Sequence, residues 1–125
     1  MFLLFVIGIG GFIGASTRFG LMRLMEHYPS FPFSTLFSNV IAAFVVGLII
    51  GTERQIVGIP INVKYFLTVG LLGGLSTFST FSLETVIMLE SNEYIKASFN
   101  ILLNVSLSII AVFAGLLIVK TVKMQ

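Results

Sequence analysis

A run of small and hydroxyl residues surrounds two phenylalanines in the middle of a hydrophobic stretch. The run reads GGLSTFSTFS from Gly73 to Ser82, and it contains Phe78 and Phe81. The edge of an aromatic ring is electropositive, whereas a cation prefers the ring face. Two ring edges beside the hydroxyls of Ser79 and Thr80 would therefore suit a small anion that has lost its water. Packing of the rings against neighbouring helices is the alternative interpretation.

Other polar side chains also lie inside hydrophobic stretches. Asn39 stands alone in one of them, and its amide supplies two N–H donors. Asn100, Asn104 and Ser108 follow one another at intervals of four, so on a helix they would form one polar stripe. These neutral groups could take the place of the water around an ion without holding it as a charge would.

Two charged residues need a separate account. Glu84 lies one turn after Phe81 on the expected helix, and an ionisable group inside a membrane is a functional candidate by default. It could instead satisfy Arg18 or a helix end. The long side chain of Arg18 could also simply reach the membrane interface. No carboxylate pair, HExxH, phosphate loop or nucleophile elbow accompanies them, so the sequence predicts no enzyme.

The composition identifies the solvent around these residues. Hydrophobic residues make up 57% of the 125-residue chain and charged residues 10%, whereas a soluble domain has about 25% charged residues. We therefore expect a lipid bilayer as the partner of this surface. The net charge of +2 is too small and too dispersed to indicate nucleic acid.

Four stretches are long and apolar enough to cross a membrane, which takes about 20 residues. They run from about Phe2 to Met22, Phe33 to Gly51, Lys64 to Glu90 and Tyr94 to Val119. Their connections are short, so neighbouring helices must be antiparallel. The sequence predicts an all-α membrane protein in which residues 1–125 form a single domain of four transmembrane helices.

The third of these helices contains the polar run at its centre, near Thr77. Gly73 and Gly74 followed by Ser and Thr are poor helix formers. Irregular backbone at this depth is tolerated where it is buried in protein or coordinates an ion. We therefore expect the third helix to be broken near its middle. The alternative is an intact helix that bends because the hydroxyls bond to carbonyls one turn earlier.

Basic residues are divided almost evenly between the two sides of such a protein. One side, with both termini and the second connection, holds Arg54, Lys64, Lys120 and Lys123; the other holds Arg18, Arg23 and Lys96. An excess of Lys and Arg normally keeps one side in the cytoplasm. Its lack favours dual topology, in which oppositely inserted copies pair, although other features could fix one orientation.

Pairs of glycines spaced four apart predict close helix contacts. They are Gly10 and Gly14, Gly47 and Gly51, and Gly70 and Gly74. Small residues at this spacing let helix backbones approach each other in lipid. The contacts could form between subunits or within one chain. A four-helix chain of this length is too thin to enclose much of a pathway, which favours a dimer.

Three motifs together resemble the Fluc (CrcB) family of fluoride channels, along nearly the whole chain. They are GGFIGASTRF at Gly10–Phe19, Asn39 within FSTLFSNVIAAF, and GLLGGLSTFSTFSLE at Gly70–Glu84. The resemblance implies a fluoride-selective ion channel that exports fluoride passively across the bacterial inner membrane. It also implies an antiparallel dual-topology homodimer with two pores and a structural sodium ion at its centre.

The resemblance further implies roles for individual residues. Phe78, Phe81 and Asn39 would line the fluoride pore, and Ser79, Thr80, Asn104 and Ser108 would complete the path. Main-chain carbonyls of Gly73 and Ser76 would hold the sodium ion. Arg18, Glu84, Gly10 and Gly14 would be structural or line the vestibule. The family often has Thr at the position of Ser76, and it commonly has an aromatic or hydroxyl residue near Asn100, so this chain departs from the family at both places.

Two other functions compete with this interpretation. A small multidrug exporter that exchanges protons for cations also has four spans, but it needs a carboxylate in the first span, and this chain has none there. Glu84 is the only candidate. A non-transporting assembly subunit would have no use for polar residues at the membrane midplane.

Overall fold

The computed structural model describes residues 1–56 and 58–123, and this part of the chain is helical apart from short connections. The elements are α1 (Phe2–Leu24), α2 (Phe33–Glu53), α3 (Ile61–Tyr65), the π-helix η1 (Phe66–Leu71), α4 (Leu72–Leu75), α5 (Phe78–Glu90) and α6 (Tyr94–Lys123). The segment Ile61–Glu90, from α3 to α5, crosses the molecule as one unit and is called the third span below. With α1, α2 and α6 it gives four helices that are long and apolar enough to cross a membrane.

The helices extend beyond the predicted apolar stretches at several ends. The first ends at Leu24, the third span begins at Ile61 and α6 continues to Lys123. Hydropathy marks only the apolar part of a span, whereas residues such as Lys and Arg are good helix formers and prolong it into the interface. The starts of α2 and α3 follow Pro32 and Pro60, where the missing N–H of proline needs no helical partner.

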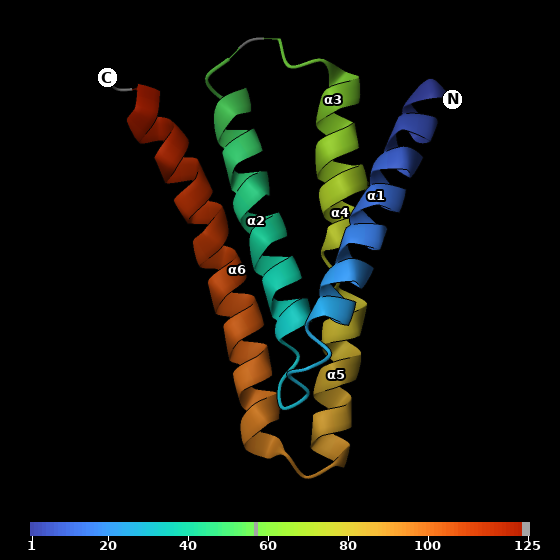
Figure 1. Ribbon diagram of the computed structural model, residues 1–125. Helices are drawn as coiled ribbons and strands as arrows, with labels where there is room; N and C mark the ends of the chain where they lie inside the picture. The colour runs from blue at the N-terminus through green and yellow to red at the C-terminus, as the bar shows by residue number, and fades with distance from the viewer. Residues whose placement is uncertain (57, 124–125) are drawn as a thin grey trace.

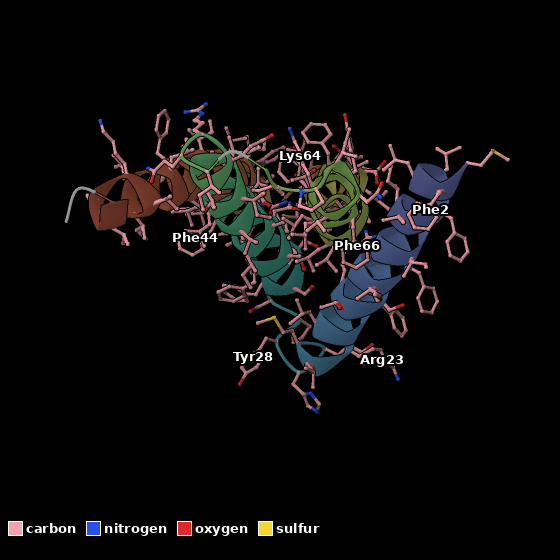
Figure 2. The ribbon with its side chains drawn as sticks, turned by 90° about the horizontal axis from the view of Figure 1, so that it is seen from above. Phe2, Arg23, Tyr28, Phe44, Lys64 and Phe66 are labelled. Atoms are coloured by element: carbon pink, nitrogen blue, oxygen red, sulfur yellow. The ribbon has the colours of Figure 1, made fainter. Side chains whose placement is uncertain are left out.

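Neighbouring helices are antiparallel, as predicted. Both termini and the connection between α2 and α3 lie at one end of the molecule, and the other two connections lie at the opposite end (Figure 1). Seen along the helices, α6, α2, the third span and α1 follow one another in a bent row rather than a closed bundle (Figure 2). Apolar side chains point outward from this row, among them Phe2, which is 67% exposed (Figure 2).

Glycines allow two pairs of helices to pack closely: α1 with the third span, and α2 with α6. A Cβ on Gly10 would lie 2.6 Å from the carbonyl oxygen of Phe66, and one on Gly14 would overlap the carbonyl of Leu71. On the other side of the row, a Cβ on Gly47 would overlap the carbonyl of Val112 in α6. The glycine pairs predicted from the sequence therefore pack α1 on the third span and α2 on α6, within one chain.

The third span is bent at the predicted place. Helix α4 ends at Leu75, and Ser76 and Thr77 are extended, with ψ values of 153° and 114°. Helix α5 then begins at Phe78 with Thr77 as its N-cap, because the Thr77 Oγ1 accepts a hydrogen bond from the Thr80 N–H at 3.2 Å. The break expected near Thr77 is present. Back-bonding occurs as well, since the Ser76 hydroxyl donates to the Leu72 carbonyl at 2.9 Å.

The π-helix η1 is a feature that the sequence did not predict. It lies in the half of the third span that packs on α1, where a Cβ on Gly70 would come within 2.7 Å of the Ile7 carbonyl oxygen. Single π-turns inside α-helices often occur at functional sites. Here the π-turn immediately precedes α4 and the bend, so irregular backbone extends over much of the middle of the third span.

Candidate functional site

A groove with a volume of about 440 Å³ runs beside the bend, between α2, the third span and α6. Aliphatic side chains and Gly73 form part of its lining, and the polar and aromatic residues in it are Asn39, Thr68, Ser76, Thr77, Phe78, Phe81, Asn104 and Ser108. These residues come from three membrane spans and lie far apart in the sequence. Most of the residues expected to form an ion path therefore share one surface.

The two phenylalanines lie next to each other at the start of α5. Their ring centroids are 5.4 Å apart and the rings are tilted by 56°. Phe81 is buried at 7% exposure, whereas Phe78 is 77% exposed and projects from the chain. The Phe78 side chain is thus open to whatever covers the groove, while the neighbouring Phe81 is enclosed by the chain.

The Asn39 amide replaces the helical hydrogen bond that the Thr77 N–H loses at the bend, and it also bonds to the Thr77 carbonyl. Its Oδ1 accepts from the Thr77 N–H at 2.8 Å, and its Nδ2 donates to the Thr77 carbonyl at 3.3 Å. The same Nδ2 also donates to the Oδ1 of Asn104 at 2.9 Å. Asn39 therefore holds the bend in place, and both of its N–H groups have protein partners in this structure.

The bend also leaves backbone carbonyls without their helical partners. In a continuous helix the Gly73 carbonyl would accept from the Thr77 N–H, which instead bonds to Asn39. The Ser76 carbonyl would accept from the Thr80 N–H, which bonds to the Thr77 hydroxyl. Carbonyls freed in this way coordinate sodium in other membrane proteins. The carbonyls of Gly73 and Ser76 thus fit a hard cation by their chemistry, and the Ser76 hydroxyl, bonded to Leu72, is not needed for it.

Ser79 and Thr80 do not line the groove. Thr80 lines a second cavity of about 220 Å³ together with Arg18 and Thr35, and the Arg18 Nη1 donates to the Thr80 Oγ1 at 3.5 Å. Ser79 is exposed, with its Oγ 3.3 Å from the Thr77 Oγ1. Successive residues of an α-helix point about 100° apart, so the two residues after Phe78 leave the face that Phe78 and Phe81 share.

Glu84 and Arg18 do not pair with each other. The Glu84 Oε1 accepts a hydrogen bond from the Thr35 hydroxyl at 2.6 Å, and Arg18 bonds to Thr80. Among the residues that the structure describes, the buried Arg18 Nε and Glu84 Oε2 have no hydrogen-bond partner. One hydrogen-bond donor and one acceptor therefore remain without partners at and beside the second cavity.

Sequence reasoning missed three threonines at this site. Thr77 caps α5 and its N–H donates to Asn39, the Thr35 hydroxyl donates to Glu84, and the Thr85 hydroxyl accepts from Asn100. A threonine at the expected break, just before the second half of the third helix, could have identified Thr77 as an N-cap. Thr35 lies one turn before Asn39, which could have marked a polar face on α2.

Comparisons with known proteins agree with this architecture. The CrcB-like protein family, Camphor Resistance (CrcB), matches residues 5–116. The chain is 43% identical to the fluoride-specific ion channel FluC of a Nitratiruptor species over 119 residues, covering 94% of this chain and 91% of the relative. It is 40% identical to FluC of Idiomarina loihiensis and 41% identical to FluC of Campylobacter jejuni, each over 94% of this chain. These two matches cover 92% and 97% of the relatives.

The fold defines a small multi-pass membrane protein, with a groove beside a bent span that is lined in part by polar side chains. The chain belongs to the CrcB/FluC family of fluoride-specific ion channels. This confirms the resemblance seen in the sequence motifs and the expectation that the protein is not an enzyme. It also sets aside the exporter and the assembly subunit as interpretations of the four spans.

Proposed function

We propose that this protein is a fluoride-selective channel that lets fluoride leave the cell passively across the bacterial inner membrane and so lowers cytoplasmic fluoride. The observation that carries the proposal is the groove beside the bend, where neutral donors and aromatic rings from three spans meet. The relatives that cover almost the whole chain are named as fluoride-specific ion channels, which supports the same function.

The groove has the chemistry that fluoride permeation needs. An isolated ion in a medium of low dielectric constant loses tens of kcal/mol of hydration, so a pore must supply other partners. Binding must still be weak enough for release. The ring edges of Phe78 and Phe81, the Asn39 amide and the Ser108 hydroxyl meet the first condition as electropositive edges and hydrogen-bond donors. They meet the second because none of them carries a charge. Arg18, Ser79 and Thr80 lie outside the groove, and we assign them to an entrance rather than to its centre.

A second copy of the chain would complete the path. The open row of helices leaves the groove uncovered, with Phe78 77% exposed on it. An inverted copy would place a second Phe78 and Phe81 over this surface and would create two equivalent pores. The even distribution of basic residues across the membrane supports insertion in both orientations. We therefore propose an antiparallel, dual-topology homodimer.

The carbonyls of Gly73 and Ser76 would hold a structural sodium ion in that dimer. They lack helical partners, and sodium suits neutral oxygen ligands from unwound helices. The ion would supply positive charge where carbonyl dipoles of two subunits converge. It would stabilise the assembly rather than move with fluoride.

Fluoride efflux from liposomes tests the proposed function. Purified protein should release fluoride from loaded vesicles once a potassium ionophore balances the charge, and chloride should stay inside. The same vesicles should not take up a cationic dye when a pH gradient is applied. Proton-driven dye uptake without fluoride efflux would contradict the proposal and indicate the exporter. Transport of neither fluoride nor the dye would indicate a non-transporting subunit.

A further inference from the structure

A chain of hydrogen-bonded side chains runs from the bend through α6 and back to α5. The Asn39 Nδ2 donates to the Asn104 Oδ1 at 2.9 Å, and the Asn104 Nδ2 donates to the Asn100 Oδ1 at 3.0 Å. The Asn100 Nδ2 donates to the Thr85 Oγ1 at 3.0 Å. The Thr85 hydroxyl donates to the Phe81 carbonyl at 2.8 Å. We call Asn104, Asn100 and Thr85 the amide relay.

The direction of every bond in this chain is fixed from both ends. The Phe81 carbonyl can only accept, so the Thr85 hydroxyl donates to it and must itself accept from Asn100. At the other end the Thr77 N–H can only donate, so the Oδ1 of Asn39 must face it. Turning any one amide over would place two donors or two acceptors against each other.

Burial makes such a reversal expensive. Asn100 is 0% exposed, Asn104 5% and Thr85 7%, so water cannot replace a lost partner. A buried polar group without a partner is strongly destabilising, and the low local dielectric strengthens bonds that are made. The hydrogen bonds of the relay therefore hold the Asn39 amide in one orientation relative to the Phe81 carbonyl.

We infer that the amide relay positions Asn39 for fluoride and that Asn100, Asn104 and Thr85 do not contact the ion themselves. This inference rests on the proposed fluoride path. The Asn104 Nδ2 donates to both the backbone and side-chain oxygens of Asn100, so it is not available to an anion. The Asn104 oxygen instead anchors one N–H of Asn39.

The two hydrogen bonds donated by Asn39 differ in strength, and this difference determines which N–H group can bind fluoride. The bond to Asn104 is 2.9 Å long, whereas the bond to the Thr77 carbonyl is 3.3 Å and is the weaker of the two. Fluoride therefore takes the N–H that leaves Thr77, while the relay keeps the other N–H and the plane of the amide in place. This assigns a role to Asn100, the fully buried member of the relay.

Substitutions at Thr85 test the relay. Thr85→Val keeps the shape of the side chain but removes both the acceptor for Asn100 and the donor to Phe81, and we expect fluoride flux to fall on the order of tenfold. Thr85→Ser keeps the hydroxyl and should stay within about twofold of the unaltered protein. The matched control is Thr52→Val, because the Thr52 hydroxyl also donates to the carbonyl one turn earlier, that of Leu48 at 2.8 Å, outside the relay. It should conduct normally.

A spectroscopic measurement separates positioning from a merely structural role. The side-chain amide signal of Asn39, in protein labelled with ¹⁵N-asparagine and assigned by its loss in Asn39→Ser, should shift in Thr85→Val and exchange its protons faster. It should not move in Thr52→Val. If Thr85→Val impairs folding, Asn100→Leu fills the same buried site, interrupts the relay by removing the acceptor of one Asn104 N–H, and should show the same loss of flux.

Two results would overturn the relay. One is equal flux in Thr85→Val, Thr85→Ser and Asn100→Leu, and the other is an Asn39 amide signal that does not respond to Thr85→Val. Failure of the unaltered protein to carry fluoride would instead reject the proposed function. The amide signal would then still report whether the relay exists.

Discussion

Phe78 and Phe81 share one side of α5, but their environments differ. Phe81 is buried, whereas Phe78 is 77% exposed on the surface that a second subunit would cover. The rings lie 5.4 Å apart, close enough for an aromatic pair worth about 0.5–1.5 kcal/mol. A change at Phe78 should therefore report on the ion path with little effect on the fold, and a change at Phe81 should affect both.

We expect Phe78→Ile and Phe81→Ile each to reduce fluoride flux by at least about tenfold, because isoleucine fills space but has no electropositive ring edge. Liposome efflux measures the flux, and size-exclusion chromatography checks that the dimer persists. Phe12→Ile is the matched control, since Phe12 is 74% exposed but lies on α1 outside the groove. Full flux in both groove variants would mean that Phe78 and Phe81 only pack against neighbouring helices and do not contact fluoride.

The placement of Ser79 and Thr80 shows where reasoning from adjacency fails at this scale. Their positions between the two phenylalanines in the sequence suggest that both lie beside the rings, whereas neither lines the groove. Once Thr77 caps α5, helical geometry keeps Phe78 and Phe81 on one face and turns the residues between them away. The side-chain partners of Asn39 could not be predicted, because Thr77 and Asn104 meet it only through tertiary packing.

The two irregular parts of the third span differ in how far the sequence predicts them. The bend follows from local chemistry, since two glycines followed by Ser and Thr are poor helix formers and Thr77 is a good N-cap. The π-helix Phe66–Leu71 has an ordinary membrane composition. Its geometry goes with close packing on α1, where Gly10 faces the Phe66 carbonyl, and such a contact cannot be read from a single stretch.

Gly14→Ala should destabilise the protein by about 1–3 kcal/mol or prevent its folding. The new Cβ would overlap the Leu71 carbonyl, and neither backbone can move aside without separating α1 from the third span. Thermal unfolding in detergent gives the stability. Gly8→Ala on the same helix is the control, because a Cβ there meets nothing within 4 Å and alanine favours the helix. Equal unfolding temperatures for the two variants would contradict the glycine-mediated contact.

At the scale of the whole molecule, the open row of helices and the distribution of basic residues both favour the proposed antiparallel homodimer. A row cannot enclose a path, and the basic residues do not instruct the chain to insert in one direction. We expect a tag on the C-terminus to be reached by a membrane-impermeant reagent from both sides of the membrane. A membrane protein of known single orientation, tagged in the same way, is the control. Labelling from one side only would reject dual topology.

The proposed sodium ion belongs to the same scale because the proposal takes its ligands from two subunits. If the Gly73 and Ser76 carbonyls of two inverted copies converge, their dipoles repel one another unless a cation lies among them. Replacing sodium by a large organic cation on both sides should therefore abolish fluoride flux slowly and weaken the dimer, as efflux and subunit-exchange measurements would show. Ser76→Ala should keep most of the activity, since the Ser76 hydroxyl bonds to the Leu72 carbonyl and the proposed ligand is the backbone oxygen. Stable activity after exhaustive removal of sodium would mean that these carbonyls are satisfied by protein or water, and the central ion would have to be abandoned.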